Sequence, residues 1–271
     1  MKVFCMLGDK RALRSKTPAM YTKILKRVGM KGACVPFMVE PDQIGQALQS
    51  LKVLNMTGAI LTIPFKETVI PHLDILSEGA NIIGAVNTII YDGKILKGYN
   101  TNAIGFMDAV DEAGFDLTGK SALVFGSGGT ARAVIFILNW LRAASIFIAD
   151  ENEKKTSRIT EQIGGETKML ESLPDKPVLV DIVINATVQT TIDEMPEFAD
   201  LVKRLEIPKC KLIVDMNYGS AENFWKDMAD SRGIKFIDAL PVLAHQAKRT
   251  FALLTKTQVD TYEFMKALES V

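Results

Sequence analysis

The chain has 271 residues, of which 48% are hydrophobic and 24% charged, which is typical of a globular protein large enough for two domains. Because lysine plus arginine and aspartate plus glutamate both number 32, net charge gives no attraction to nucleic acid or to a membrane, and we expect neither as a partner. Three dispersed cysteines and two histidines match no metal-site pattern, so we expect no metal. Because the sequence shows neither a signal peptide nor an apolar run long enough to span a bilayer, we expect a cytoplasmic protein with reduced thiols.

The first hundred residues combine short apolar strands with helical stretches. We expect strands at residues 3–7, 33–38, 58–63, 86–91 and 94–99. We expect helices at residues 41–54, in the stretch that leads to Gly79, and at 101–113. Thr17-Pro18 opens a further helix, with Thr17 as its cap. Asp92-Gly93, between the last two strands, is a strong signal for a hairpin turn.

From Lys120 onward the chain alternates regularly between strand and helix. The expected strands are 121–126, 145–150, 179–184, 211–216 and 235–237. This alternation predicts an open, mostly parallel, doubly wound sheet with helices on both faces, so the fold class is α/β. We expect the two closing helical stretches to fold back on the first domain. The predicted division is a substrate-binding α/β domain of residues 1–100 plus 240–271 and a Rossmann-type nucleotide-binding domain of residues 101–239, with the cleft between them as the default site.

The stretch from Ala122 to Leu138 predicts a dinucleotide site. An apolar strand enters a glycine turn and leaves into an apolar helix. In this arrangement Gly126 permits the tight turn, Gly128 lets the backbone approach a pyrophosphate, and Ala131 is small where the helix packs on the strand. The residues expected to bind the phosphates are Gly126, Ser127, Gly128, Gly129, Thr130 and Ala131. An ordinary strand–helix turn is the alternative.

The next strand suggests which dinucleotide is used. It ends at Asp150, about 20 residues past the glycines, where an acidic side chain accepts hydrogen bonds from the ribose 2′-hydroxyl and repels a 2′-phosphate. Glu151 adds a second negative charge and no arginine follows in the turn, although Lys154 and Lys155 come slightly later. We therefore expect NAD, with NADP as the less favoured cofactor. The alternative is that Asp150 and Glu151 only cap the following helix.

Several polar residues of the first domain suit a polyhydroxylated ligand. Lys66 follows a strand end and Pro64, where its amine could exchange a proton with a hydroxyl or stabilise an alkoxide, although such a lysine is more often a solvated surface charge. Hydroxyl and amide side chains that can both donate and accept are found at Ser15, Thr17, Asn87, Thr88, Asn100, Thr101 and Asn102. Each of these taken singly is as readily explained by helix caps and turns.

Together, and in this order, the motifs resemble the shikimate/quinate dehydrogenase family along nearly the whole chain. The family's Ser-x-Ser-Pro loop, its Val-Thr-x-Pro-x-Lys motif and its Gly-Ala-Val-Asn-Thr motif are matched by Ser15–Pro18, Leu61–Lys66 and Gly84–Thr88. Gly98–Asn102 is similar to the family's Gly-x-Asn-Thr-Asp motif, and Gly126–Ala133 is similar to its glycine-rich phosphate loop. Further along, Asn185–Thr187 is similar to its Asn-Ala-Thr segment, Asp215 with Tyr218 to its Asp-x-x-Tyr pair, and Gln246 to its closing glutamine.

The resemblance implies an NAD(P)-dependent oxidoreductase of aromatic amino acid biosynthesis that interconverts shikimate and 3-dehydroshikimate, or quinate and 3-dehydroquinate, by hydride transfer. It implies that Lys66 carries the proton. It implies a small hydroxylated ring carboxylate as substrate, bound by Ser15, Thr17, Thr62, Asn87, Asn102, Tyr218 and Gln246. It places Asn185, Thr187 and Asp215 near the cofactor. We expect a monomer or a homodimer.

The main departure from the family is Asn102, which stands where the family has a catalytic aspartate that pairs with the lysine. An amide can hold a substrate hydroxyl, but it cannot accept a proton and offers no charge to Lys66. We expect turnover to be lower by roughly 10²–10⁴ than with aspartate, the usual contribution of an acid–base group. A slow or altered enzyme, a natural loss of the chemistry and an engineered aspartate-to-asparagine change are all consistent with this residue.

Two other functions fit parts of the pattern. Asn102 also suits a dinucleotide-binding sensor or partner protein with little or no catalysis. Glycine-rich turns with a following acidic residue also bind S-adenosylmethionine, so a nucleotide-dependent transferase fits the second domain, although it does not explain the motifs of the first.

Overall fold

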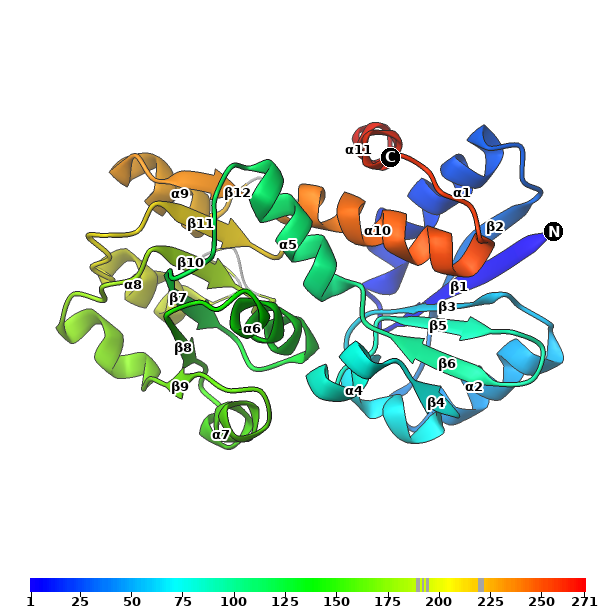
Figure 1. Cartoon of the computed structure of the whole chain (residues 1–271), viewed down its shortest axis with the longest axis horizontal. Helices are drawn as coiled ribbons and strands as arrows, with labels where there is room; N and C mark the ends of the chain where they lie inside the picture. The colour runs from blue at the N-terminus through cyan, green and yellow to red at the C-terminus, as the bar shows by residue number, and fades with distance from the viewer. Residues whose placement is uncertain (189–190, 192, 194, 219–221) are drawn as a thin grey trace. The chain divides into compact units, whose positions relative to one another are not determined.

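A computed structural model of the full chain describes residues 1–188, 191, 193, 195–218 and 222–271. The chain divides into two compact units, Met1–Gly105 with Leu243–Val271, and Phe106–Val242. It passes from the first unit to the second within helix α5 (Asn102–Glu112) and returns within helix α10 (Ala239–Thr255) (Figure 1). Each unit is built on its own six-stranded sheet.

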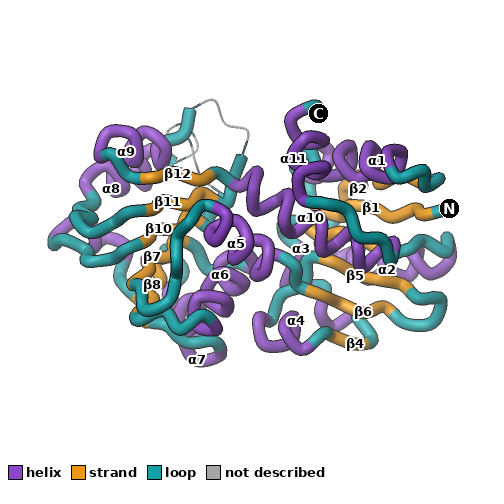
Figure 2. The backbone as a smooth tube through the Cα atoms, turned by 45° about the horizontal axis from the view of Figure 1, so that its top comes forward, coloured by secondary structure: helices purple, strands orange, loops and turns teal. Residues whose placement is uncertain are grey.

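The sheet of the first unit is mixed. Its strands are β1 (Lys2–Gly8), β2 (Gly32–Met38), β3 (Gly58–Leu61), β4 (Ile75–Leu76), β5 (Thr88–Tyr91) and β6 (Leu96–Tyr99). They lie in the order β2-β1-β3-β5-β6-β4, and Figure 2 shows β2, β1, β5, β6 and β4 following one another in this order. β1 runs parallel to β2 and β3, whereas β5 is antiparallel to both of its neighbours. The carboxyl ends of β1, β3 and β6 and the amino end of β5 therefore share one edge of the sheet.

Helices cover both faces of this sheet. The remaining helices of the unit are α1 (Thr17–Arg27), α2 (Ile44–Val53), α3 (Phe65–Thr68), α4 (Glu78–Ile83) and α11 (Thr261–Glu269), with single 3-10 turns at 12–14, 41–43 and 70–72. One face packs on α2, α3 and α4 through a core that includes Cys5, Leu48 and Phe65. The other face packs on α1 and α10, and α11 packs on these two helices. Tyr21 of α1 stacks on Phe251 of α10 and meets Phe264 of α11 in an edge contact.

Two local predictions for this unit were wrong. Strand β4 lies within the stretch before Gly79 that was expected to be helical, because its two residues pair with β6 and are too few to show an alternating pattern. Thr17 does not cap α1, since it is the first helical residue and Lys16 holds the cap position without a side-chain hydrogen bond.

The sheet of the second unit is entirely parallel. Its strands are β7 (Ser121–Phe125), β8 (Ser145–Ala149), β9 (Glu166–Thr167), β10 (Ile182–Asn185), β11 (Leu212–Asp215) and β12 (Lys235–Ile237). They lie in the order β12-β11-β10-β7-β8-β9. Numbered within the unit, this is the 3-2-1-4-5-6 order of a Rossmann fold, whose crevice for a dinucleotide lies at the carboxyl ends of the strands where the order reverses, between β7 and β10.

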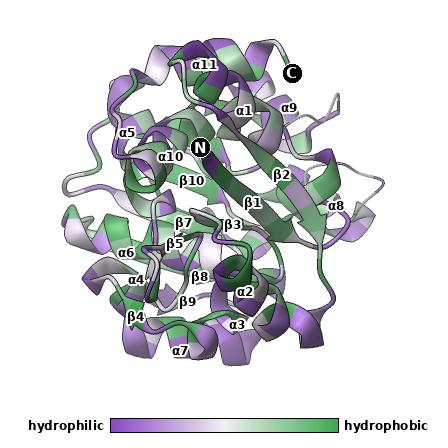
Figure 3. Cartoon of the chain, turned by 90° about the vertical axis from the view of Figure 1, so that its right-hand side faces the viewer, coloured by the Kyte–Doolittle hydropathy of each residue, from purple (hydrophilic) through white to green (hydrophobic). Residues whose placement is uncertain are grey.

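The helices of the second unit bury alternate residues of these strands. They are α6 (Gly129–Trp140), α7 (Glu153–Gln162), α8 (Pro196–Arg204) and α9 (Phe224–Arg232), with a 3-10 turn at 170–175. Leu123 and Phe125 belong to a core with α8 and α9, in which the Phe125 and Trp225 ring centroids are 5.1 Å apart. Figure 3 shows the general pattern, with hydrophobic strands such as β1 and a more hydrophilic α7 at the surface.

Among the described residues, no helix is both long and apolar enough to cross a membrane, and no cluster of histidine, cysteine and acidic side chains has the composition of a metal site. The thiols of Cys5, Cys34 and Cys210 are free and buried.

Phe264 anchors α11 to the first unit, because its fully buried ring contacts both Tyr21 and Phe251. We expect Phe264→Ala to lower the free energy of unfolding by about 3–5 kcal/mol, the usual effect of removing a large buried ring. Urea unfolding measures this. Tyr262→Ala, which removes a ring of the same helix that is 66% exposed, is the control and is expected to change stability by less than about 0.5 kcal/mol. Equal effects would contradict the assignment of Phe264 as the anchor.

Candidate active site

Backbone hydrogen bonds draw four segments together at one edge of the first-unit sheet. The N–H of Thr62, just after β3, donates to the Leu7 carbonyl at 3.0 Å, and the N–H of Leu61 donates to the Asn87 carbonyl at 2.8 Å. The Asn87 N–H in turn donates to the Tyr99 carbonyl at 3.0 Å. Gly8 is required here, because a Cβ at this position would lie 2.2 Å from Cγ2 of Thr62. The edge therefore brings together motifs that are far apart in the sequence.

The side-chain amide of Asn87 is the centre of a buried polar network at this edge. Its Oδ1 accepts the backbone N–H of Thr101 at 2.8 Å and the hydroxyl of Thr88 at 3.4 Å. Its Nδ2 donates to Oγ1 of Thr101 at 2.8 Å and to Oδ1 of Asn102 at 2.7 Å. Asn87 is only 2% exposed. Both N–H bonds of its amide are thus used within the unit.

Thr250 on α10 closes this network. Its hydroxyl oxygen lies 2.9 Å from the hydroxyl oxygens of both Thr88 and Thr101. Hydrogen bonds can then run in a closed cycle from Asn87 through Thr101, Thr250 and Thr88 back to Asn87, with each hydroxyl donating once. Sequence analysis did not single out Thr250. The signal in the sequence was that Thr250 lies at helical spacing among the apolar residues Ala247, Phe251 and Leu254, which places its hydroxyl on the buried face of the helix.

Lys66 lies beside the same edge. Its backbone carbonyl on α3 accepts the N–H of Val86, the neighbour of Asn87, at 2.6 Å. The side chain is half-buried. Burial disfavours the ammonium form and lowers the pKa of Lys66 to about 8, while the charge of Glu67 raises that pKa by less. An amine in this condition is able to exchange a proton near neutral pH.

The remaining predicted substrate residues of the first unit lie in the loop before α1 and on α10. Oγ of Ser15 accepts the N–H of Thr17, which is 4% exposed. Lys16 between them is tied to the far end of the chain, since its Nζ donates to the carbonyls of Leu268 at 3.1 Å and Val271 at 2.7 Å. Gln246 lies on α10 and is partly exposed. Tyr218 belongs instead to the second unit, after β11.

In the second unit, the glycine turn joins β7 to α6 at the switch point of the sheet. Gly126 has φ +113°, and a Cβ there would lie 2.9 Å from the carbonyl of Ala186, so a larger residue does not fit. A Cβ on Gly128 would meet nothing within 4 Å, so the backbone there is open to a close approach. Helix α6 begins at Gly129 without a side-chain cap, which leaves its N-terminal N–H groups for an anion. These features fit a pyrophosphate. Ser127 and Ala131 are buried beside the turn, and Thr130 lies in the first turn of α6.

Asp150 follows β8, the strand next to the glycine turn. Its Oδ1 accepts the N–H of Asn152 at 2.8 Å. Asn152, rather than Asp150, caps α7, because Oδ1 of Asn152 accepts the N–H of Lys155 at 3.1 Å. The alternative that Asp150 serves as the helix cap is therefore wrong. A recess of about 540 Å³ beside it is lined by Glu151, Asn152, Glu153 and Lys154.

Asp215 at the end of β11 is completely buried among amides. Its Oδ1 accepts from Nδ2 of Asn185 at 2.9 Å and from both the backbone and side-chain N–H groups of Asn217, and its Oδ2 accepts from Nδ2 of Asn223 at 2.7 Å. Burial nevertheless raises the pKa of Asp215 to about 6. Oδ1 of Asn185 accepts from the backbone N–H and the hydroxyl of Thr187. These residues hold the loops after β10 and β11 in place.

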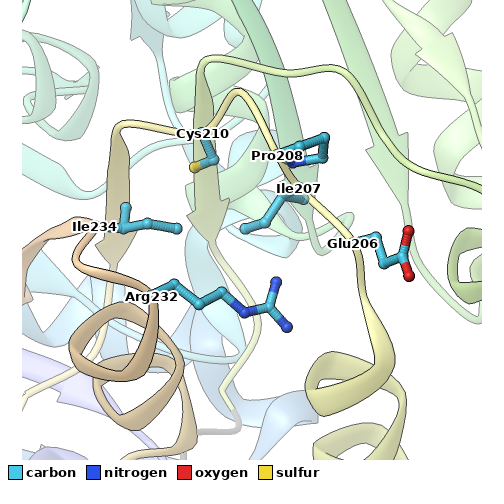
Figure 4. Close-up of a pocket in the computed structure, with 6 residues that line it drawn as sticks. All are labelled: Glu206, Ile207, Pro208, Cys210, Arg232 and Ile234. Carbon is cyan, nitrogen blue, oxygen red and sulfur yellow. The ribbon is translucent and has the colours of Figure 1, made fainter.

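A second recess of about 320 Å³ lies at the other end of these strands, beside the loop that precedes β11 (Figure 4). The guanidinium of Arg232 there donates to the carbonyls of Leu205 at 2.6 Å and Lys203 at 3.2 Å, so it satisfies the C-terminal end of α8. We assign Arg232 a structural role.

The second unit has a Rossmann sheet with an open glycine turn, and the first unit has a desolvated lysine beside a polar sheet edge. These are the parts of a dinucleotide-dependent oxidoreductase. Comparisons with known proteins specify the family. Residues 9–89 match the model of the shikimate dehydrogenase substrate binding domain, and residues 109–219 match that of shikimate / quinate 5-dehydrogenase.

Relatives and solved structures agree with these matches. Shikimate dehydrogenase (NADP(+)) of Caldanaerobacter subterraneus is 33% identical over 94% of this chain and 91% of its own, and that of Desulforamulus reducens is 35% identical over 89% and 86%. Shikimate 5-dehydrogenase from Thermus thermophilus, solved with NADP(H) and shikimate, superposes with a TM-score of 0.86 at 28% identity, over 100% of this chain and 99% of that one. The chain belongs to the shikimate/quinate dehydrogenase family and is an oxidoreductase that uses a nicotinamide dinucleotide.

The closed hydrogen-bond cycle predicts that Thr250 contributes through its hydroxyl. We expect Thr250→Val to lower the free energy of unfolding by about 1–3 kcal/mol, because it leaves the buried hydroxyls of Thr88 and Thr101 without this partner. Thr250→Ser keeps the hydroxyl and is expected to lose less. Denaturant unfolding of both variants measures the difference. A serine variant that is as unstable as the valine variant would show that the methyl group, and not the hydroxyl, is what matters.

Proposed function

We propose that this chain interconverts the ring alcohol and the ring ketone of the pair shikimate and 3-dehydroshikimate, with quinate and 3-dehydroquinate as the second pair. The observation that carries the proposal is Lys66, an amine with a pKa of about 8 whose backbone is bonded next to the polar edge formed around Asn87. The names of the relatives and the substrate bound in the Thermus structure give further support.

Lys66 moves the proton in this proposal. The nicotinamide ring, when bound, supplies the hydride acceptor for the alcohol and the hydride donor for the ketone. As the carbon–hydrogen bond of the ring carbinol breaks, its hydroxyl proton passes to the neutral amine of Lys66, and in the reverse direction the ammonium returns it to the forming alcohol. Asn102 orients the same ring oxygen. Ser15, Thr17, Thr62 and Gln246 bind the remaining hydroxyls and the carboxylate, and Asn87 holds Asn102.

The glycine turn of the second unit holds the dinucleotide. Gly126, Ser127, Gly128, Gly129, Thr130 and Ala131 cradle the pyrophosphate at the start of α6. Asp215, Asn185 and Thr187 support this site from the loops after β10 and β11, since their side chains bond to one another. By the same assignment, the first unit is the substrate-binding domain and the second is the nucleotide-binding domain.

We propose NAD as the preferred dinucleotide, although the relatives named above are NADP(+) enzymes. Asp150 and the recess beside it place three acidic side chains after β8, where a 2′-phosphate would lie. The only cation lining this recess among the described residues is Lys154. The local charge therefore favours a ribose with a free 2′-hydroxyl.

A dinucleotide-binding protein without catalysis is the weaker candidate. The lysine, the glycine turn and the polar edge are all present, and a protein retained only for binding would not need the lysine desolvated. No feature of the first unit supports a transferase.

Replacing Lys66 tests the proton transfer. We expect Lys66→Met to lower kcat by roughly 10²–10⁴ with little change in dinucleotide affinity, because an acid–base group is lost. In the unsubstituted protein, alcohol oxidation should rise and ketone reduction should fall as the pH increases through about 8, since oxidation needs the neutral amine. Lys52→Met, which removes a surface lysine paired with Asp74, is the matched control. Unchanged kcat in Lys66→Met would refute the assignment.

Replacing Asp150 tests the choice of dinucleotide. We expect kcat/KM to be higher with NAD than with NADP, and Asp150→Asn to improve the use of NADP by about tenfold, because it removes one like charge near the 2′-phosphate while keeping an oxygen for the N–H of Asn152. Glu161→Gln, which removes one exposed charge near the other end of α7, controls for the charge change. A preference for NADP before any substitution would overturn the proposal.

A further inference from the structure

The orientation of the Asn102 amide is determined by the network beneath it. The backbone N–H of Thr101 can only donate, so the atom of Asn87 that it meets at 2.8 Å must be the amide oxygen. The Asn87 amide nitrogen then faces Asn102 at 2.7 Å and donates to it. Because that contact needs an acceptor, the oxygen of the Asn102 amide is turned toward Asn87.

The amide nitrogen of Asn102 is consequently turned away from this contact. Nδ2 of Asn102 donates to no residue in the described part of the chain, although the residue is only 4% exposed. This nitrogen is not fully buried and retains some accessible area. The backbone of Asn102 adds rigidity, because its N–H donates to Oδ1 of Asn100 at 3.0 Å. A nearly buried donor is thus held in place for an acceptor that is not part of this unit.

We propose that Asn102 acts as a hydrogen-bond donor to the reacting oxygen of the ring, and that this chain therefore binds the ketone of its substrate pair more tightly than the alcohol. The proposal rests on the proposed function, which supplies the pair of ligands. It makes Asn102 a residue that sets specificity between the two oxidation states of the ring.

The chemistry of the two ligands explains the preference. A ketone oxygen only accepts hydrogen bonds, whereas an alcohol must also donate its proton to an acceptor. At pH 7 Lys66 is mainly the ammonium form, so the two side chains assigned to this oxygen are both donors. The alcohol proton then finds no acceptor from either of them. A carboxylate at position 102 would accept that proton and would present only acceptors to the ketone. A buried donor left without a partner weakens binding by about tenfold or more.

Binding without the dinucleotide tests this inference separately from catalysis. The experiment is calorimetric titration of the complete protein with shikimate and with 3-dehydroshikimate at pH 7. We expect the Kd of the ketone to be lower by about tenfold. Asn102→Asp should reverse the preference, because its carboxylate keeps the oxygen that meets Asn87 and places a second acceptor where Nδ2 now lies. Thermal unfolding of each variant confirms that it is folded.

A second variant reverses the amide without changing residue 102. In Asn87→Asp, the carboxylate still accepts the Thr101 N–H, but its other oxygen can only accept, so the Asn102 amide must rotate to donate to it. The oxygen of Asn102 then faces the ligand, and the preference should shift toward the alcohol. Asn81→Asp adds the same charge at an exposed position of α4, outside this network, and should leave the ketone favoured.

The outcomes separate the two claims. Equal or tighter binding of the alcohol by the unsubstituted protein overturns the inference and leaves the proposed function standing. A ketone preference that neither Asn102→Asp nor Asn87→Asp reduces also overturns the inference. Binding of neither ring acid overturns the proposed function and this inference with it.

Discussion

The hydrogen bond from the backbone N–H of Thr101 to the side-chain oxygen of Asn87 is the constraint on which the first unit's site depends. It settles which end of the Asn87 amide faces Asn102, and Thr88, Thr101 and Thr250 complete the cycle around it. Buried polar groups are generally hydrogen-bonded, and the backbone N–H of Thr101 allows only one orientation of the Asn87 amide. Helix α10 is part of this arrangement, which gives the closing segment of the chain a direct link to the site.

The second unit uses the same physical device for another purpose. Asp215 is a buried carboxylate whose oxygens are surrounded by amide donors from three asparagines. Those hydrogen bonds offset part of the cost of its burial and tie two loops to the sheet edge. The glycine turn needs no such network, because its conformation is local: Gly126 has φ +113°, and the start of α6 provides the anion site.

These differences explain what the sequence could predict. The elements with strong periodicity were found, and the glycine turn was identified because strand, turn and helix are contiguous. Strands β4 and β9 have two residues each and exist only through pairing with a neighbour, so no local pattern marks them. Thr250 was not identified because its partners lie about 150 residues away in the chain. The orientation of the Asn102 amide was likewise unreadable, since it follows from a neighbour's hydrogen bonds and not from the residue itself.

Burial dominates the charge state of Lys66. The most direct test of this account is an NMR titration of the Lys66 side chain in protein with ¹³C-labelled lysine, assigned by its loss in a Lys66 variant. The account predicts a midpoint near pH 8, with the amine and the ammonium form both populated under working conditions. A midpoint above about 10, as for a solvated lysine, would contradict the claim that this site holds a lysine ready to exchange a proton.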